Sequence, residues 1–311
     1  TSRDWSSDVC SSDLENMRPI KLFTDSTSDL TKEIYESIDC KVLPLGVSFG
    51  ERHFVDGVDI DTKKIYELVK ETGTLPKTNA VNINVFEENF KKCLDEGNDI
   101  VFVPISSNFS SNFSTANMVA IQLGEENEEY KDRIQVIDSR SLSSGIGLQL
   151  FSIHDDIKAG YSLTEIAERA KDRVDRVNAE FVVDTMEYLY KGGRCSGLSY
   201  FFGKSFHLHP VIRVEHGKMI VHKITRGKKI KGVDFQISEF LEQLKNDNVE
   251  LSHIFITHSL VEGDDKYMYD IVTKYVDPSI VQITVAGSIV ASHCGPGTIG
   301  LLYITKTKVI K

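Results

Sequence analysis

The sequence predicts an α/β protein of two domains, a parallel-sheet βαβ domain followed by a mixed-sheet α+β domain. The chain has 311 residues, which is enough for two domains. Strand-like and helix-like runs alternate as far as about Val177, which predicts βαβ units. Beyond that point two strand-like runs flank a short turn at Glu215–Gly217, as in a hairpin. The expected division is a non-native or disordered leader at 1–16, an N-terminal α/β domain at 17–176 and a C-terminal α+β domain at 177–311.

The leader carries no structural pattern. Thr1–Asn16 has no apolar period, and it has neither the basic segment nor the apolar core of a signal peptide. The run resembles translated sequencing-adapter sequence. We therefore expect the protein's own sequence to begin at Met17, shortly before the apolar run Ile20–Thr24.

The N-terminal half has the pattern of a parallel sheet with crossover helices. Short apolar runs rich in β-branched residues are typical of buried strands, and Asp99–Ile105 is the strongest of them. Capping residues such as Asp61 and terminal glycines such as Gly73 mark the helices. The elements expected in order are a strand at Ile20–Thr24, a helix near Leu30–Ile38, a β-like run at Lys41–Phe49, helices at Asp61–Gly73 and Asn84–Glu96, a strand at Asp99–Ile105, a helix from Ser110 to about Gly124, a strand at Arg133–Ile137 and a helix from about Leu142.

The second half predicts a mixed sheet. The elements expected in order are a strand at Ala179–Val183, a hairpin of Val211–Val214 with Lys218–Ile224, a helix at Gly232–Leu244, and strands at Ile254–Thr257, Ile280–Val285 and Thr298–Ile304. The last two strands flank Ser292–Gly297, which predicts a rigid turn that carries His293. A lone histidine is usually a packed or capping residue, and it becomes a site candidate only where the fold brings it to other polar groups.

Composition excludes several classes of protein. The formal net charge is −10, whereas a nucleic-acid-binding protein needs a basic surface for phosphates, so we expect no nucleic acid partner. No apolar run approaches the roughly 20 residues of a membrane span. The cysteines at 40, 93, 195 and 294 form no Cys-x-x-Cys pair, so we expect no metal site. Free thiols without a secretory signal predict a cytoplasmic protein.

Hydroxyl and amide side chains follow the strand at Asp99–Ile105. The run Ser106–Phe113 places them where a helix begins. In an open α/β sheet, ligands lie at the carboxyl ends of strands, and the first N–H groups of a helix attract an anion. Uncharged donors at that place suit a carboxylate or a phosphate. The alternative is a helix N-cap with polar neighbours.

A second candidate is the run Lys191–Arg194. Its two glycines let the backbone approach a ligand closely, and Arg194 offers a planar set of donors for a carboxylate or phosphate. The alternative is a helix that ends at glycine and is followed by a surface arginine.

Other motifs are incomplete. Gly193–Gly197 has the G-x-C-x-G form of a nucleophile elbow around Cys195, but an elbow follows a strand and this run follows a helical pattern. Neither Gly203–Ser205 nor Gly145–Gly147 completes a phosphate-binding glycine motif, so we expect no nucleotide cofactor.

Taken together, a series of motifs from Lys21 to the C-terminus resembles the DegV family. The motifs are Asp25–Leu30, Leu43–Leu45, Asp56–Gly57, Pro76–Thr78, Ser106–Ser107 with Ser110, Val136–Ser139, Glu187–Leu189 with Lys191–Arg194, and His293–Gly297. Such a set is more specific than any single motif. The resemblance implies a bacterial lipid-binding protein, not an enzyme, that holds one long-chain fatty acid such as palmitate between its two domains.

The resemblance also implies roles for residues and a partner. Thr78 and Ser110 would bind the carboxylate with His293 beside them, and Arg194 would lie in the head-group network or on the surface that faces the partner. Two further candidates for that network or surface are Asn79 and Ser107. The implied partner is a separate fatty acid kinase that phosphorylates the carboxylate, and the resemblance allows transient contact with a membrane surface for lipid exchange.

Two points stay open at the level of the sequence. Asn79–Ala80 and Ser111–Asn112 depart from the residues usual in the family, so head-group geometry and chain preference are not fixed by the resemblance. An alternative from a different class is a hydrolase or acyltransferase that uses Cys195 or Ser110 as nucleophile with His293.

Overall fold

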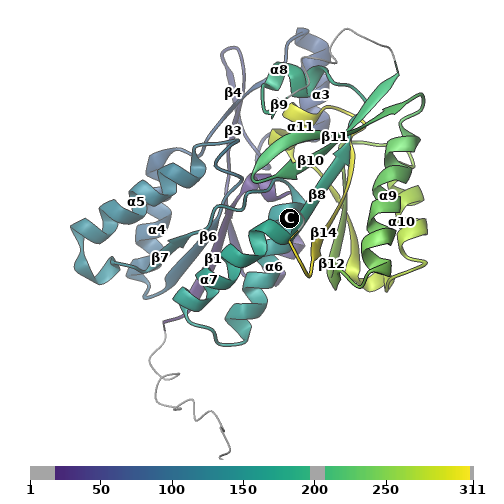
Figure 1. The fold of residues 1–311 in the computed structure, drawn as a ribbon. Coiled ribbons are helices and arrows are strands. Elements are labelled where there is room, and N and C mark those ends of the chain that lie inside the picture. Colours follow the sequence, from purple (N-terminus) through teal and green to yellow (C-terminus); the bar gives the residue numbers. More distant parts are fainter. Residues whose placement is uncertain (1–17, 197–206, 309–311) are drawn as a thin grey trace, which may run out of the picture.

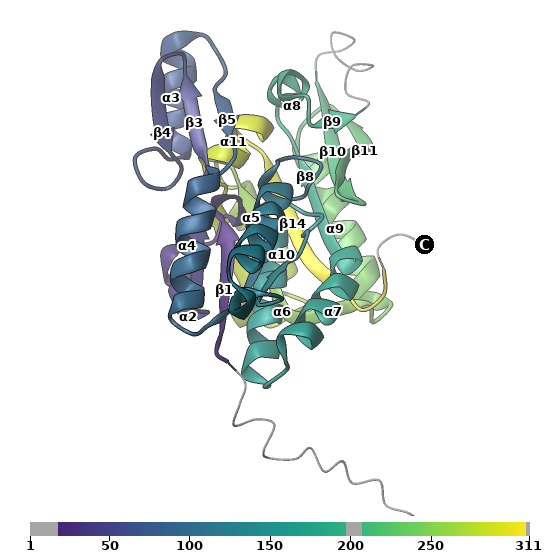
Figure 2. The same ribbon diagram turned by 90° about the vertical axis from the view of Figure 1, so that its left-hand side faces the viewer.

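A computed structural model describes residues 18–196 and 207–308, and Figures 1 and 2 show its ribbon from two sides. The expected leader at 1–16 and the Gly203–Ser205 run lie outside the described residues. Within the described ranges, no helix combines the length and the apolar character needed to cross a membrane.

The N-terminal half contains a parallel sheet of four strands in the order β2-β1-β6-β7. Its strands are β1 (Ile20–Asp25), β2 (Cys40–Leu43), β6 (Asp99–Val103) and β7 (Ile134–Val136). Every pairing in it is parallel, as the alternation of strands and helices predicts. The helices of this half are α2 (Lys32–Ser37), α3 (Thr62–Thr72), α4 (Ile83–Asp95), α5 (Asn112–Glu126), α6 (Ser144–Lys158) and α7 (Leu163–Arg173).

A small antiparallel sheet stands beside the parallel sheet. Its order is β4-β3-β5, and its strands are β3 (Gly46–Phe49), β4 (Arg52–Val55) and β5 (Lys77–Asn79). The β-like run expected at Lys41–Phe49 is confirmed, and it contributes to two strands, β2 and β3, which lie in different sheets. Pro44 lies between these strands and has no N–H for a ladder hydrogen bond.

The second half forms a mixed sheet of seven strands in the order β13-β12-β14-β8-β10-β11-β9. The strands are β8 (Val177–Val182), β9 (Cys195–Ser196), β10 (Leu208–Glu215), β11 (Lys218–Arg226), β12 (Val249–His258), β13 (Val281–Val285) and β14 (Ile299–Thr305). The pairs β12–β13 and β11–β9 are parallel and the others antiparallel, which confirms the predicted fold class. The helices are α8 (Glu187–Gly192), α9 (Ile230–Lys245), α10 (Asp264–Val272) and α11 (Ser288–Cys294).

The large elements stack in layers. Figure 1 shows α4 and α5, the parallel sheet, α6 and α7, the mixed sheet, and α9 and α10 in succession. α6 contacts β1 on one side and β8, β12 and β14 on the other. One apolar core continues through this layer, from Leu22 and Val101 in the parallel sheet to Phe181 and Leu302 in the mixed sheet. The two sheets are thus held at a fixed separation by a shared core.

The rigid turn expected at Ser292–Gly297 is wrong in its first part. His293 lies in the last turn of α11, and the chain turns only at Gly295 and Gly297, which both have positive φ. This short helix is stabilised at its N-terminal end, because Asp29 accepts a hydrogen bond from the N–H of the N-cap residue Gly287 and Asp56 accepts one from the N–H of Ser288. His293 is therefore presented by a helix.

Candidate functional site

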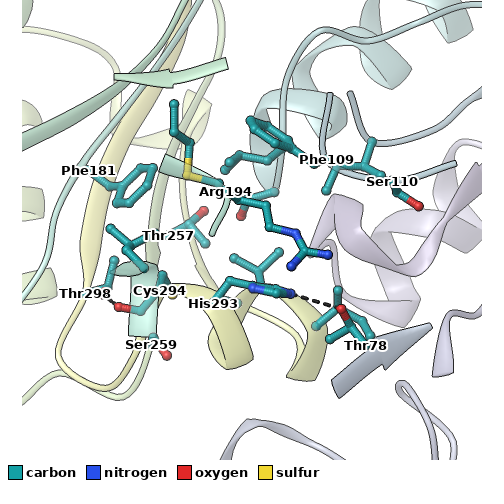
Figure 3. A pocket seen from close by; sticks show the side chains of 18 of the residues that line it. Thr78, Phe109, Ser110, Phe181, Arg194, Thr257, Ser259, His293, Cys294 and Thr298 are labelled. Carbon is teal, nitrogen blue, oxygen red and sulfur yellow. Dashed lines mark hydrogen bonds between the residues drawn. The ribbon is translucent and has the colours of Figure 1, made fainter. Parts of the chain in front are cut away.

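A cavity of about 290 Å³ lies where the two large sheets and the small sheet meet. Pockets that hold small molecules typically start at about 300 Å³. Both halves of the chain contribute to its wall, and Figure 3 shows it from close by. The N-terminal half contributes Thr78 of β5, then Ile105, Phe109, Ser110 and Ser111 after β6, and Leu142 and Ser143 before α6. The second half contributes Phe181 of β8, Thr257 of β12, His293 of α11 and Leu302 of β14.

The polar side chains that the sequence singled out gather at one side of this cavity. Figure 3 shows Thr78, Ser110, Arg194 and His293 converging there, with Phe181 on the opposite side. Arg194 is exposed, whereas Thr78, Ser110 and His293 are partly buried. The cavity thus has a polar end with access to solvent.

Thr78 and His293 form a direct hydrogen bond. Thr78 Oγ1 lies 3.0 Å from His293 Nε2. Burial, and then the positive charge of Arg194, lowers the pKa of His293 to about 4, so the imidazole is neutral at pH 7. Its Nδ1 is buried and has no hydrogen-bond partner among the described residues.

The environment of Nδ1 lets us assign the tautomer. A buried N–H without an acceptor is rarer than a buried lone pair without a donor. We therefore assign the hydrogen to Nε2, which donates to Thr78 Oγ1. The hydroxyl hydrogen of Thr78 is then free to bind a ligand oxygen.

Ser110 also keeps a free donor. Its Oγ accepts a hydrogen bond from the backbone N–H of Asn112, at 3.3 Å, at the start of α5. The N-cap residue Ser111 makes no side-chain cap hydrogen bond. The hydroxyl hydrogen of Ser110 therefore lies beside the positive end of a helix of 15 residues, a favourable place for an anion.

Apart from Ser111, which is the neighbour of Ser110, three hydroxyl side chains of the wall are hydrogen-bonded within the protein. Thr257 Oγ1 bonds to Ser144 Oγ at 2.6 Å and to Thr284 Oγ1 at 2.8 Å. Thr298 Oγ1 donates to the carbonyl of Cys294 at 2.9 Å, and Ser143 Oγ donates to Asp29 at 2.5 Å. These side chains offer a ligand mainly their carbon atoms, so the free donors of the described wall are concentrated at the end with Thr78 and Ser110.

The remaining predicted residues differ in position. Asn79 lines the cavity, although it is exposed and its amide donates to Ser48 Oγ at 2.9 Å. Ser107 does not line it, because its N–H and Oγ bind the carboxylate of Asp138 at 3.1 and 2.5 Å. Cys195 does not line it either, and burial raises the pKa of its thiol to about 12.

The helix that carries His293 is held from the other half of the chain. Asp29 Oδ1 accepts from Gly287 N–H at 2.8 Å, and Asp56 Oδ1 accepts from Ser288 N–H at 3.0 Å and from its hydroxyl at 2.5 Å. Burial raises the pKa of both carboxyl groups. The sequence places Asp29 only within the motif Asp25–Leu30, and no local signal points to its partner 258 residues later.

One cluster outside the cavity has the composition of a metal site. Ligand atoms of Glu180, His222 and Glu239 lie within 4.8 Å of one another. The guanidinium of Arg213 pairs with both carboxylates, and its Nε lies 2.9 Å from Glu180. Because the guanidinium of Arg213 already pairs with the carboxylates that a metal ion would need, we interpret this cluster as an ion-pair network that joins β8, β10, β11 and α9.

With this geometry in place, the family can be assigned. A family model described as "Uncharacterised protein, DegV family" matches residues 19–306. The chain belongs to the DegV family. The resemblance drawn from the motifs is thereby confirmed.

Individual DegV relatives match over almost their whole length. A DegV domain-containing protein of Clostridium perfringens is 29% identical over 290 residues, covering 93% of this chain and 99% of the relative. The solved structure "Fatty Acid Binding of a DegV family Protein from Thermus thermophilus" has a TM-score of 0.80 at 25% identity, covering 93% of this chain and 100% of that chain. A stearic acid-binding protein from Eubacterium ventriosum has a TM-score of 0.81 at 24% identity, covering 93% and 99%, which shows a shared fold.

The Lys-Gly-Gly-Arg motif of this DegV protein has a separate reason for each glycine. A Cβ on Gly192 would lie 2.7 Å from His293 Nδ1, so only glycine leaves room for the imidazole. Gly193 has φ 67° and ends α8 in the left-handed region, with no atom within 4 Å of an added Cβ. Arg194 Nη1 then donates to the carbonyl of Gly192 at 2.5 Å, which directs it to the polar end.

Proposed function

We propose that this DegV protein binds a long-chain fatty acid in the cavity, with the carboxylate at the end formed by Thr78, Ser110 and His293. The observation that carries the proposal is the distribution of free donors, which are concentrated at one end of a wall that is otherwise apolar or internally hydrogen-bonded. The fatty acid binding described for the Thermus thermophilus relative supports it.

The energetics fit an acid with a long chain. Burying a dozen or more methylenes at ~0.8 kcal/mol each offers on the order of 10 kcal/mol before ordering costs. The tail would then supply the affinity, and Thr78 and Ser110 would orient the head group. A buried carboxylate without partners is costly, so these two donors also lower the cost of burying the charge.

The position of the head group suits presentation to a second protein. Arg194 is exposed, and Thr78 and Ser110 are only partly buried, so the carboxylate would lie near solvent. We propose that a separate fatty acid kinase phosphorylates it there, and that the DegV protein acts as a binding subunit in the cytoplasm. The free cysteines at 40, 93, 195 and 294 fit a reducing compartment.

The hydrolase alternative finds less support. A serine or cysteine nucleophile needs a base within hydrogen-bond reach, yet His293 Nε2 is bonded to Thr78. Ser110 Oγ accepts a hydrogen bond from the N–H of Asn112, and among the described residues it has no hydrogen bond to a histidine. The raised pKa of the Cys195 thiol keeps it protonated at neutral pH, which makes it a poor nucleophile.

The test measures the Kd of a long-chain acid and the Kd of its methyl ester, in the wild type and in the double variant Thr78→Ala, Ser110→Ala. Each hydroxyl contributes roughly 1.5–3 kcal/mol as a donor to a charged acceptor, and the two losses are coupled because both bind one carboxylate. We expect the Kd of the acid to rise more than about tenfold. The Kd of the ester, which has no charge, should change far less.

A matched control is Thr298→Ala, which removes a hydroxyl that lines the cavity but donates to the Cys294 carbonyl. It should leave the preference for acid over ester unchanged. Equal losses of acid and ester affinity in the double variant would show that the carboxylate does not bind at Thr78 and Ser110. Mass spectrometry of the native protein should in addition detect a co-purified fatty acid.

A further inference from the structure

The motif Asp25–Asp29 begins with the last residue of β1, and the side chain of that residue does not line the cavity. Asp25 is fully buried and does not line the cavity wall. Its Oδ1 accepts from Thr27 N–H and Thr27 Oγ1 at 3.1 and 2.5 Å, and its Oδ2 accepts from Ile105 N–H and Asn112 Nδ2 at 3.0 and 2.8 Å. Burial raises its pKa, but four donors and no acceptor favour the carboxylate form. Asp25 thus joins the ends of β1 and β6 to the start of α5.

Asn112 extends this connection to the small sheet. Its side chain is fully buried, donates to Asp25 through Nδ2 and accepts from Val81 N–H through Oδ1 at 3.0 Å. Its own backbone N–H donates to Ser110 Oγ. Asn112 therefore contacts both the hydroxyl of Ser110 and the backbone of Val81, which lies three residues after Thr78.

We propose that Asn112 and Asp25 are positioning residues for the carboxylate site. They hold the Ser110 loop and the Thr78 strand at the separation at which both hydroxyls reach one carboxylate, and they do not touch the ligand. Thr78 belongs to the small sheet, whereas Ser110 lies in the loop between β6 and α5, so their spacing depends on a link of this kind. Hydrogen bonds weaken steeply when donor and acceptor move apart or out of line, so a small shift of either segment is enough to lose one of them. This inference rests on the proposed function.

The test is Asn112→Ala, measured by the ratio of the Kd of a methyl ester to the Kd of the corresponding acid. We expect the acid to bind at least about fivefold more weakly and the ester to change by less than about twofold, so that the ratio falls. The matched control is Asn98→Ala, a buried asparagine whose amide donates to the Cys93 carbonyl far from the cavity. A loss of stability alone would leave the ratio of both variants at the wild-type value.

Asn112→Asp provides a second route if the alanine variant does not fold. It keeps the size of the side chain and the acceptor for Val81, but it places an oxygen against the Asp25 carboxylate where the amide donated. The same fall in the ratio is expected. An unchanged ratio in the variant that folds would overturn the positioning role. If wild type itself did not prefer acid to ester, or if Thr78→Ala, Ser110→Ala left the preference intact, the proposed function would fail instead.

Discussion

The most direct consequence of the His293 environment is a dependence of stability on pH. In the folded protein the pKa of His293 is about 4, against an ordinary value of 6.5. Between these two values the unfolded chain binds more protons than the folded chain, so the free energy of unfolding falls as the pH falls through this window. The stabilising contribution of the neutral imidazole is complete above pH 6.5 and is lost progressively toward pH 4.

The magnitude follows from the same two values. One pKa unit corresponds to about 1.4 kcal/mol, so lowering the pH from 7 to 5 should reduce the free energy of unfolding by about 2 kcal/mol through His293 alone. The buried carboxyl groups of Asp25, Asp29 and Asp56 act in the opposite direction, because their raised pKa values favour the folded state as the pH falls. The His293 contribution must therefore be measured as a difference between variants.

The assay is urea unfolding of delipidated wild type and His293→Gln at pH 7 and pH 5. The glutamine amide can still donate to Thr78 but does not titrate, so the variant should lack the loss of about 2 kcal/mol. A bound fatty acid should also diminish the loss, since its carboxylate favours the imidazolium form. If wild type and variant lost equal stability between the two pH values, His293 would not be the buried neutral imidazole described above.

Three further substitutions test the surroundings of that imidazole. Gly192→Ala should weaken binding of the acid, as measured by ligand titration, because its Cβ would displace His293 from Thr78. Gly193→Ala should leave binding unchanged but reduce the free energy of unfolding by about 1 kcal/mol, the cost of positive φ, which is measured as a lower melting temperature. Arg194→Ala should raise the pKa of His293 in an NMR titration, because it removes the neighbouring positive charge. Acid affinity should fall less than about fivefold in this last variant, because the arginine is exposed. An unchanged His293 titration would show that the charge of Arg194 does not lower the pKa of His293.

Most strands and helices could be predicted because their signals are local, although α7 and α10 are not among the expected elements. Apolar β-branched runs such as Asp99–Val103 and caps such as Asp61 lie within the elements that they define. The strands β4 and β5 could not be predicted in this way. Lys77–Asn79 is short and polar, and its strand conformation depends on pairing with β3, about 30 residues earlier in the chain.

The candidate site likewise combines residues that a local pattern identifies with roles that depend on contacts between residues distant in the sequence. Ser107 and Ser110 belong to one hydroxyl-rich run, and their roles differ because Asp138 captures Ser107, a partner that the local pattern does not reveal. Ser288–Cys294 has only seven residues, too few for a clear helical period, and it is stabilised by carboxylates from the N-terminal half. Contacts of this kind depend on the tertiary fold, so the local sequence does not predict them.

The anchoring of α11 also bears on synthesis of the chain. Gly287 follows Asp29 by 258 residues, so at roughly 5–20 residues per second the acceptor is made about 13 to 50 s before its donor. Throughout that interval the helix that presents His293 does not exist, and Asp29 and Asp56 lack the N–H groups that they bind in the finished fold. A growing polypeptide on the ribosome thus lacks α11 and His293, and under the proposed function it can bind an acid only after translation has passed α11.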